Sequence, residues 1–170
     1  GAKFPVSLGD SLQVSMVTPG AFTTWTYKDL FDSAPSTSGY VADKGGSNDE
    51  MHIVVTDETG LISGVAGTVL EKFAFVSQAS DAKKFDGSTN YYKEVINGSS
   101  KYIWWMDHAS TLTKAGGRSV ESFVTVSTAF TTQLGGGEDG PSLDVGDIDT
   151  GFQVFNDAET IDVNLLIGAP

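Results

Sequence analysis

Short apolar segments with alternating polarity, separated by turn residues, are the feature that most constrains this chain. Alternation of apolar and polar residues at a period of two is typical of strands. It recurs at 11–17, 51–56, 68–77, 101–106, 120–128 and 160–167. The uninterrupted apolar runs are only a few residues long, whereas a helix that crosses a bilayer needs about 20. We therefore expect an α+β fold with antiparallel strands and no membrane-spanning helix.

Two segments repeat their apolar residues at helical spacing instead. They are residues 89–97 and 147–156, and the second places an apolar stripe at i, i+4 and i+7, formed by Ile148, Phe152 and Phe155. Segment 101–106 is hydrophobic on both faces, which predicts a central strand. We expect Trp104 or Trp105, Phe73 or Phe75 and the 148–152–155 stripe to share one buried cluster.

The charge of the chain is strongly and unevenly negative. Lys and Arg number 10 against 22 Asp and Glu, a net charge of −12, and no basic residue follows Arg118. Counterion release cannot drive such a chain onto nucleic acid, and an anionic membrane should repel it. An acidic surface can serve solubility alone, or it can meet a basic partner, and both interpretations stay open. The absence of Cys excludes disulfides and thiolate chemistry.

A catalytic interpretation is available for Asp107 and His108, which follow the aromatic segment directly. His108 would act as a base and Ser110 as the nucleophile. No Gly-x-Ser-x-Gly motif supports this, and the other histidine, His52, lies inside a predicted strand. We expect a polar cap at a strand end, no catalytic residue and no enzymatic activity.

Two further motifs suggest ligands but lack a required partner. Asp144, Asp147 and Asp149 miss the spacing of a calcium loop, and helix N-terminal capping explains them better. The glycines at 135–137 are followed by Glu138 and Asp139 rather than by Gly-Lys-Ser, so a turn is favoured over phosphate binding. We expect no metal site and no cofactor.

The aromatic pairs Trp104–Trp105 and Tyr91–Tyr92 are candidates for a carbohydrate platform. Aromatic residues on a central strand and on a helix are more often part of the core. We therefore expect core positions for both pairs. One functional hypothesis is therefore that the chain is a carbohydrate-binding or adhesin-like β-rich module. Another is that it is a small hydrolase.

Segments along nearly the whole chain resemble one protein family in their order and spacing. They include SLGDSLQV at 7–14, DEMHIVVTDETG at 49–60, NYYKEVIN at 90–97, KYIWW at 101–105 and QLGGGEDG at 133–140. Together they resemble the tail sheath protein of contractile-tailed bacteriophages.

The resemblance implies a structural protein of the virion, assembled in the host cytoplasm. Sheath subunits form six-fold rings around a tail tube, and contraction triggered by the baseplate drives the tube through the host envelope. The partners would be other sheath subunits, tube proteins and baseplate proteins.

Family members are much longer than this chain, so residues 1–170 would be a single middle domain of a longer protein. The resemblance implies a β-sandwich flanked by a few helices, ending in the first strand of an α/β part. Because the interlocking arms of the family would lie outside this segment, we expect the isolated fragment to be monomeric.

Overall fold

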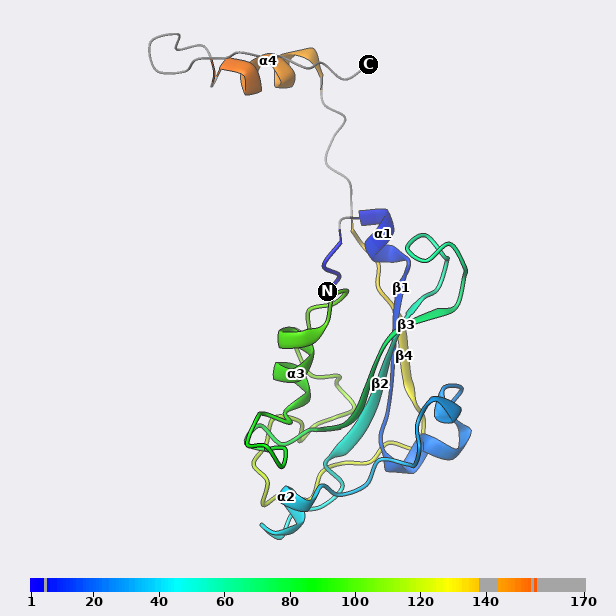
Figure 1. Cartoon of the computed structure of the whole chain (residues 1–170), viewed down its shortest axis with the longest axis vertical. Helices are drawn as coiled ribbons and strands as arrows, with labels where there is room; N and C mark the ends of the chain where they lie inside the picture. Colours follow the sequence, from blue (N-terminus) through cyan, green and yellow to red (C-terminus); the bar gives the residue numbers. More distant parts are fainter. Residues whose placement is uncertain (5, 138–143, 154, 156–170) are drawn as a thin grey trace. The chain divides into compact units, whose positions relative to one another are not determined.

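The computed structural model describes residues 1–4, 6–137, 144–153 and 155, and it divides into two compact units, Gly1–Glu138 and Asp139–Pro170. Each unit is described by itself. The elements are α1 (Val6–Asp10), β1 (Leu12–Val17), η1 (Pro19–Thr24), η2 (Lys28–Leu30), α2 (Gly39–Ala42), β2 (Glu50–Asp57), β3 (Thr68–Ser77), α3 (Tyr92–Ser99), β4 (Phe130–Gln133) and α4 (Val145–Gln153), with labels in Figure 1. That residues 1–170 are one sheath-protein domain stays a prediction.

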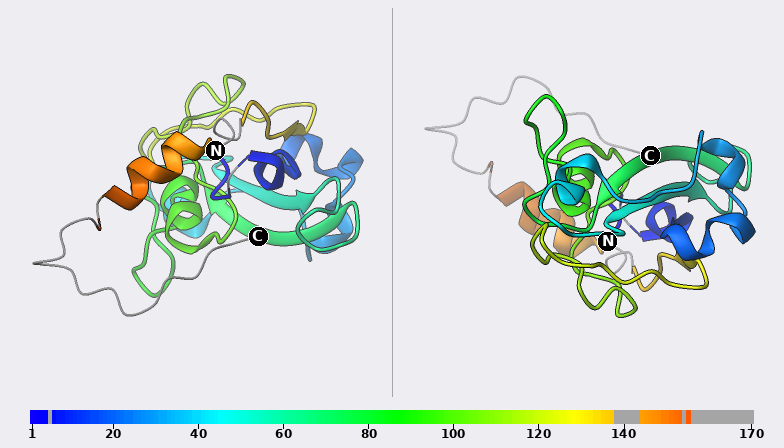
Figure 2. Two further views of the ribbon diagram at one scale, coloured as in Figure 1. Left: turned by 90° about the horizontal axis from the view of Figure 1, so that it is seen from above. Right: turned by 90° about the horizontal axis from the view of Figure 1, so that it is seen from below.

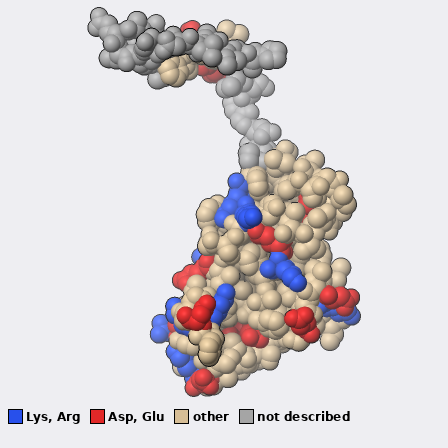
Figure 3. All heavy atoms as spheres, viewed as in Figure 1, with Lys and Arg blue, Asp and Glu red and all other residues tan. Residues whose placement is uncertain are grey.

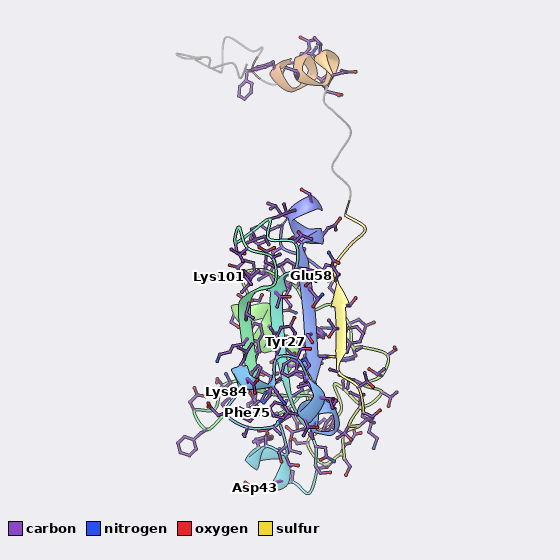
Figure 4. All side chains as sticks on the ribbon, turned by 90° about the vertical axis from the view of Figure 1, so that its right-hand side faces the viewer. Tyr27, Asp43, Glu58, Phe75, Lys84 and Lys101 are labelled. Carbon is purple, nitrogen blue, oxygen red and sulfur yellow. The ribbon has the colours of Figure 1, made fainter. Side chains whose placement is uncertain are left out.

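The first unit is built on a four-stranded antiparallel sheet with the order β3-β2-β1-β4. Figure 4 shows this sheet with its strands side by side. The α+β class is confirmed, and the strands predicted at 11–17, 51–56 and 68–77 correspond to β1, β2 and β3. Among the described residues these four strands form one sheet, and the strand predicted at 160–167 lies outside them.

One face of the sheet, here called the aliphatic face, carries apolar side chains from alternate positions of β1 and β2. They are Leu12, Val14, Met16, Met51, Ile53 and Val55. Tyr92 and Ile96 of α3 cover them, together with Ile103 and Leu112 from the segment that follows, and all four are buried. The predicted helix at 89–97 is therefore confirmed as α3, although it begins and ends slightly later.

The opposite face, here called the mixed face, carries Ser15, Val17, His52, Val54 and Thr56. These side chains are also buried, so β1 and β2 are covered on both sides. The cover is the segment from η1 to η2, which supplies Ala21 and Trp25. Figures 1 and 2 show this blue segment on one side of the sheet and α3 on the other.

Segment 101–106 is not the central strand that its hydrophobicity predicts. Its one bridge is antiparallel, between Ile103 and Ala2. Its backbone bonds to side chains of α3 and Ser100, as described below, and also to the backbone of residues 1–3: the Lys3 N–H donates to the Tyr102 carbonyl at 2.8 Å, and the Trp104 N–H donates to the Gly1 carbonyl at 2.7 Å. Hydrophobicity on both faces does not mean burial on both faces here, because Trp104 and Met106 are 49% and 72% exposed.

Segment 120–128 is likewise not a strand. Ser47 accepts a hydrogen bond from the Phe123 N–H at 2.8 Å, and Thr18 Oγ1 accepts one from the Val126 N–H at 2.8 Å. These isolated partners lie in loops, so no ladder forms. The fourth strand is β4 instead, a four-residue strand that sequence patterning did not predict.

The second unit contains α4, which corresponds to the helix predicted at 147–156. Taken by itself, α4 leaves Ile148 and Phe152 47% and 50% exposed, and Phe155 lies beyond the end of the helix. The predicted contact of this stripe with the aromatic residues of the first unit stays a prediction. The other part of that prediction is confirmed, since Trp105 and Phe73 both pack against the core of the aliphatic face.

Candidate functional site

The candidate catalytic residue His108 is part of a polar and aromatic cap on α3. Its Nδ1 lies 2.5 Å from the Tyr92 hydroxyl, and its ring lies close to the rings of Tyr91 and Tyr92. Burial raises the pKa of the Tyr92 phenol well above its ordinary value. The phenol therefore stays protonated, and its hydroxyl shares one hydrogen bond with His108 Nδ1.

Gly116 lies against the His108 ring near Nε2. A Cβ at this glycine would lie 2.8 Å from His108 Nε2, and the glycine has φ = +85°. Ser110 is exposed, and the side chain of His108 bonds to Tyr92 rather than to this serine. These contacts do not form a Ser–His pair, and because segment 101–106 is not a strand, His108 does not cap a strand end as the sequence predicts.

One face of α3 holds the aromatic segment 101–108 in place. Asn97 accepts from the Trp105 N–H at 2.7 Å and donates to the Trp105 carbonyl at 3.0 Å. Lys93 donates to the Met106 carbonyl at 2.6 Å, and Ser100 Oγ, just beyond the helix, accepts from the Ile103 N–H at 3.0 Å. Positions 93, 97 and 100 follow helical spacing, so α3 and the residue after it supply the partners of Ile103, Trp105 and Met106 in this backbone.

A hollow of about 260 Å³ opens beside this segment. Its apolar walls include Ile103, Trp105, Phe130 and Leu134. Trp104 is 49% exposed, and the Lys3 ammonium lies 3.7 Å from the centre of its ring, a cation–π distance.

The four aromatic residues that were candidates for a carbohydrate platform do not gather on one surface. Tyr91 and Tyr92 belong to the buried core, which confirms the core interpretation for that pair. Trp105 packs edge-on against Tyr92 at 5.2 Å between ring centres. The core prediction is wrong for Trp104 alone, which is half exposed.

The acidic residues of α4 form a capping box. Asp144 Oδ1 accepts from the N–H groups of Gly146 and Asp147 at 2.7 and 2.9 Å, and Asp147 Oδ2 accepts from the Asp144 N–H at 3.1 Å. The capping interpretation is confirmed, since these are the reciprocal bonds of that motif. Asp149 is exposed. Within the described part of the chain, no three His, Cys, Asp or Glu side chains group as metal ligands.

The glycine run 135–137 follows β4, and Gly136 adopts φ = +77°. That backbone conformation suits glycine, but residues 135–137 form no turn and the segment after them lies outside the described residues, so the turn stays a prediction. The hollow that the run lines also contains Asp10, whose carboxylate disfavours a phosphate.

Three buried polar residues of β2 and its flanks were not recognised as such from the sequence. The first is Asp57, which ends β2. Its carboxylate accepts from the N–H groups of Gly60, Ile62 and Ser63 at 3.1, 3.0 and 2.6 Å, and from the Ser11 hydroxyl. Burial opposes the charged form, but these hydrogen bonds outweigh it and hold the pKa of Asp57 well below its ordinary range. The charged carboxylate thus organises the 58–67 loop.

The second is Asp49, which precedes β2 and is fully buried. Its carboxylate accepts from the Ser38 N–H and hydroxyl, both at 2.8 Å, and from the Ser77 hydroxyl at 2.5 Å. It therefore ties the N-cap of α2 to the end of β3.

The third is His52, whose two ring nitrogens are both engaged. Nδ1 accepts from the Phe75 N–H at 3.0 Å, and Nε2 donates to the Ser33 carbonyl at 2.9 Å. Its ring stacks on Phe31 at 4.1 Å between centres. Burial lowers the pKa of His52, so the ring is neutral. The signal in the sequence was a histidine between apolar neighbours, which indicates a second buried face.

No helix in the described part of the chain has the length and apolar character that crossing a membrane requires.

Comparison with known proteins gives one similarity to consider and no family assignment. No protein-family model matches the chain. The chain is 27% identical over 116 residues to a protein named tail sheath protein from Salmonella phage ViI. The match covers 64% of this chain and 15% of that protein, so the chain spans a minor part of its relative's length.

Proposed function

We propose that this chain is a structural, non-enzymatic segment of a bacteriophage tail sheath. The observation that carries the proposal is the similarity over 116 residues to the tail sheath protein of Salmonella phage ViI. The arrangement of the candidate residues supports it, because His108 bonds to the Tyr92 hydroxyl of α3 and Asp144 and Asp147 cap α4. These side chains serve the local structure.

The finer proposal is that the sheath is contractile. The chain would belong to the virion, assemble in the host cytoplasm with other sheath subunits in six-fold rings, and contact tube and baseplate proteins. Contraction would then drive the tube through the host envelope. A subunit that transmits force benefits from loops fixed to its sheet, and the buried carboxylates of Asp49 and Asp57 supply such fixation here.

Electron microscopy of the phage that encodes this chain tests the proposal. Antibodies raised against the purified chain should decorate the tail along its length, in both extended and contracted particles. The control is the same serum after absorption with the purified chain. Decoration confined to the head or to the tail tip, or no decoration of intact and disrupted particles, contradicts the proposal.

Carbohydrate binding is the second candidate function, and the half-exposed ring of Trp104 beside the apolar hollow favours it. A glycan array with the purified chain tests it. Binding that is lost on Trp104→Ala, and retained when the exposed Phe85 is replaced by Ala, would support this alternative. An array without signal would leave it without support.

A further inference from the structure

Strand β3 carries an irregularity opposite His52. The pairing of β2 with β3 shifts at this point, so that His52 alone stands opposite both Ala74 and Phe75. One residue opposed by two on the neighbouring strand is the defining feature of a β-bulge, which bends the strand and re-aims its groups. Figure 4 labels Phe75 near the end of the sheet. The bulge brings a peptide of β3 within reach of the His52 ring.

The backbone at Phe75 is strained. Its φ is +52°, in the left-handed region that a bulky residue rarely adopts. Two side chains hold it there, because His52 Nδ1 accepts from the Phe75 N–H at 3.0 Å and the Asn90 amide donates to the Phe75 carbonyl at 3.0 Å. Strain of this kind persists only where the surroundings enforce it, and it is common in switch regions.

The bond between His52 and the Phe75 N–H requires a neutral imidazole. Nε2 donates to the Ser33 carbonyl at 2.9 Å, so Nδ1 is the one nitrogen left as an acceptor. A second proton on the ring converts Nδ1 into a donor, and two donors then face each other. Because His52 is fully buried, water does not offer the missing acceptor, and the conflict costs free energy.

A turn of the peptide between Ala74 and Phe75 resolves this conflict. The peptide is trans, so the Ala74 carbonyl points away from His52 while the Phe75 N–H points towards it. A rotation by about 180° brings the carbonyl towards Nδ1 and takes φ of Phe75 to about −130°, an ordinary extended value. Ala74 is exposed, and both residues line a hollow of about 570 Å³, so the peptide borders free space.

We propose that His52 and the Ala74–Phe75 peptide form a proton-driven conformational switch. Neutral His52 holds the strained conformation through the Phe75 N–H. Protonated His52 donates to the Ala74 carbonyl after the peptide has turned over, and the strain at Phe75 is released. The N–H and the carbonyl of this peptide thereby exchange sides, which changes the hydrogen-bonding groups beside the hollow. The switch goes beyond the proposed function and does not depend on it.

Several elements bring charged groups to the neighbourhood of His52. On β2, Glu50 stands two positions earlier on the same face, and its carboxylate accepts from the Ser36 N–H at 2.9 Å. On β3, the Lys72 ammonium lies 5.8 Å from the centre of the Phe31 ring, which stacks on His52. The segments beside η2 and before Asn90 carry exposed charges on Lys28, Asp29, Asp32, Lys83, Lys84 and Asp86. β1 and η1 contain no charged residue.

None of these charged groups forms an ion pair with His52. The ion pairs of the described residues join Asp81 to Lys44 and Arg118. Figure 3 shows charges of both signs interspersed on the visible face of the first unit, so no field of one sign acts there. The protonation of His52 is therefore governed by its burial and by the two groups that its ring nitrogens bind.

NMR spectroscopy of the 170-residue chain between pH 7.5 and 5 tests the switch. A positive φ brings the amide and Hα protons of one residue close together, which gives a strong nuclear Overhauser effect. We expect this signal at Phe75 at pH 7.5 and its loss at pH 5. The Phe75 amide and the His52 ring should shift with one common midpoint below 6.5, since burial lowers the pKa of His52. The Val14 amide on the aliphatic face is the internal reference.

Phe75→Gly and Phe75→Ala form a matched pair that tests the role of strain. Both variants remove the ring, and they differ in the cost of a positive φ, which glycine adopts freely. The left-handed region disfavours an L residue by about tenfold or more. The midpoint of Phe75→Gly should therefore lie about one pH unit below that of Phe75→Ala.

Two further variants separate His52 from Glu50, the neighbouring carboxyl whose pKa burial raises. His52→Gln should abolish the change at Phe75, whereas Glu50→Gln should leave it in place. A positive φ at Phe75 that persists while the His52 ring is protonated would overturn the switch, and so would unfolding before the ring takes up a proton. Equal midpoints for the glycine and alanine variants, or a change at Phe75 that survives His52→Gln, would also contradict it.

Discussion

The two faces of β1 and β2 are both buried, but by different chemistry. On the aliphatic face, β1 and β2 contribute apolar side chains only, and α3 covers them. On the mixed face the same strands contribute Ser15, His52 and Thr56, covered by irregular segments that include Trp25. An apolar core tolerates repacking when volume is kept, whereas a buried polar group needs its particular partner. The aliphatic face should therefore respond to lost volume, and the mixed face to lost hydrogen bonds and to pH.

The largest effect is expected on the aliphatic face. Ile53 is fully buried at the centre of its cluster, so Ile53→Ala should lower the free energy of unfolding by about 2–5 kcal/mol through lost transfer free energy and a residual cavity. Chemical denaturation monitored by tryptophan fluorescence measures this. Ile53→Val is the matched control and should cost about 0.5–1.5 kcal/mol. Equal losses for the two variants would mean that volume does not govern this face.

The next effect tests hydrogen bonding on the mixed face. Ser15 Oγ accepts from Trp25 Nε1 at 2.8 Å and contacts Thr131 Oγ1 at 2.7 Å. Ser15→Ala should cost about 1–3 kcal/mol, because it leaves a buried indole N–H without its partner. The double variant with Trp25→Phe should lose less than the sum of the single variants, since the indole N–H is then absent. Additive losses would show that the bond contributes little.

A smaller effect should appear as a pH dependence of the mixed face. The pKa of His52 is lower in the folded chain than its ordinary value of 6.5. The unfolded chain therefore binds a proton first as the pH falls, and stability should decrease below about pH 6.5 with a slope of at most about 1.4 kcal/mol per pH unit. Denaturant midpoints measured from pH 7.5 to 5 test this.

His52→Gln supplies the comparison for that titration. It removes the titrating group, so the difference between the native chain and the variant isolates the contribution of His52 from those of the carboxylates. The variant should be less stable at pH 7.5 and should show a shallower slope. A slope unchanged by the substitution would assign the pH dependence to other groups.

The smallest effect is expected outside the sheet. Phe152 is 50% exposed on α4, so Phe152→Ala should change the unfolding free energy by only about 0.5 kcal/mol or less in the dilute chain. Phe73→Ala is the matched control, because Phe73 packs against the aliphatic face. It should lower the free energy of unfolding by more than Phe152→Ala does. A loss of several kcal/mol at Phe152 would place this ring in a core.

The sequence predicted the aliphatic face better than the mixed face. Alternation located β1, β2 and β3 because Leu12, Val14 and Met16 keep a strict period of two against the aliphatic face. It missed the burial of Ser15 and His52, because a polar residue in a strand is indistinguishable from a solvent-facing one until its cover is known. The 101–106 error has a related cause, since side chains of Asn97 and Lys93 bond to part of this backbone, and no period in the sequence indicates such partners.

The candidate site residues show which contacts can be predicted from spacing along the sequence. The interval between Asp144 and Asp147 was enough to favour a helix cap, because capping is a local motif. The contact of His108 with Tyr92 joins residues 16 positions apart in sequence. Local spacing does not determine such a contact, so the sequence predicted a polar cap without its partner.

The pairing of β1 with β4 has a consequence for how the chain is made. Ser15 and Thr131 are neighbours in the sheet although 116 positions separate them. At a synthesis rate of about 5–20 residues per second, the ribosome adds the β4 partner roughly 6–20 s after β1. During that interval β1 can pair with β2 but has an unprotected edge beside apolar residues. Early translation is therefore the stage at which a nascent chain is most exposed to pairing with its neighbours on the same message.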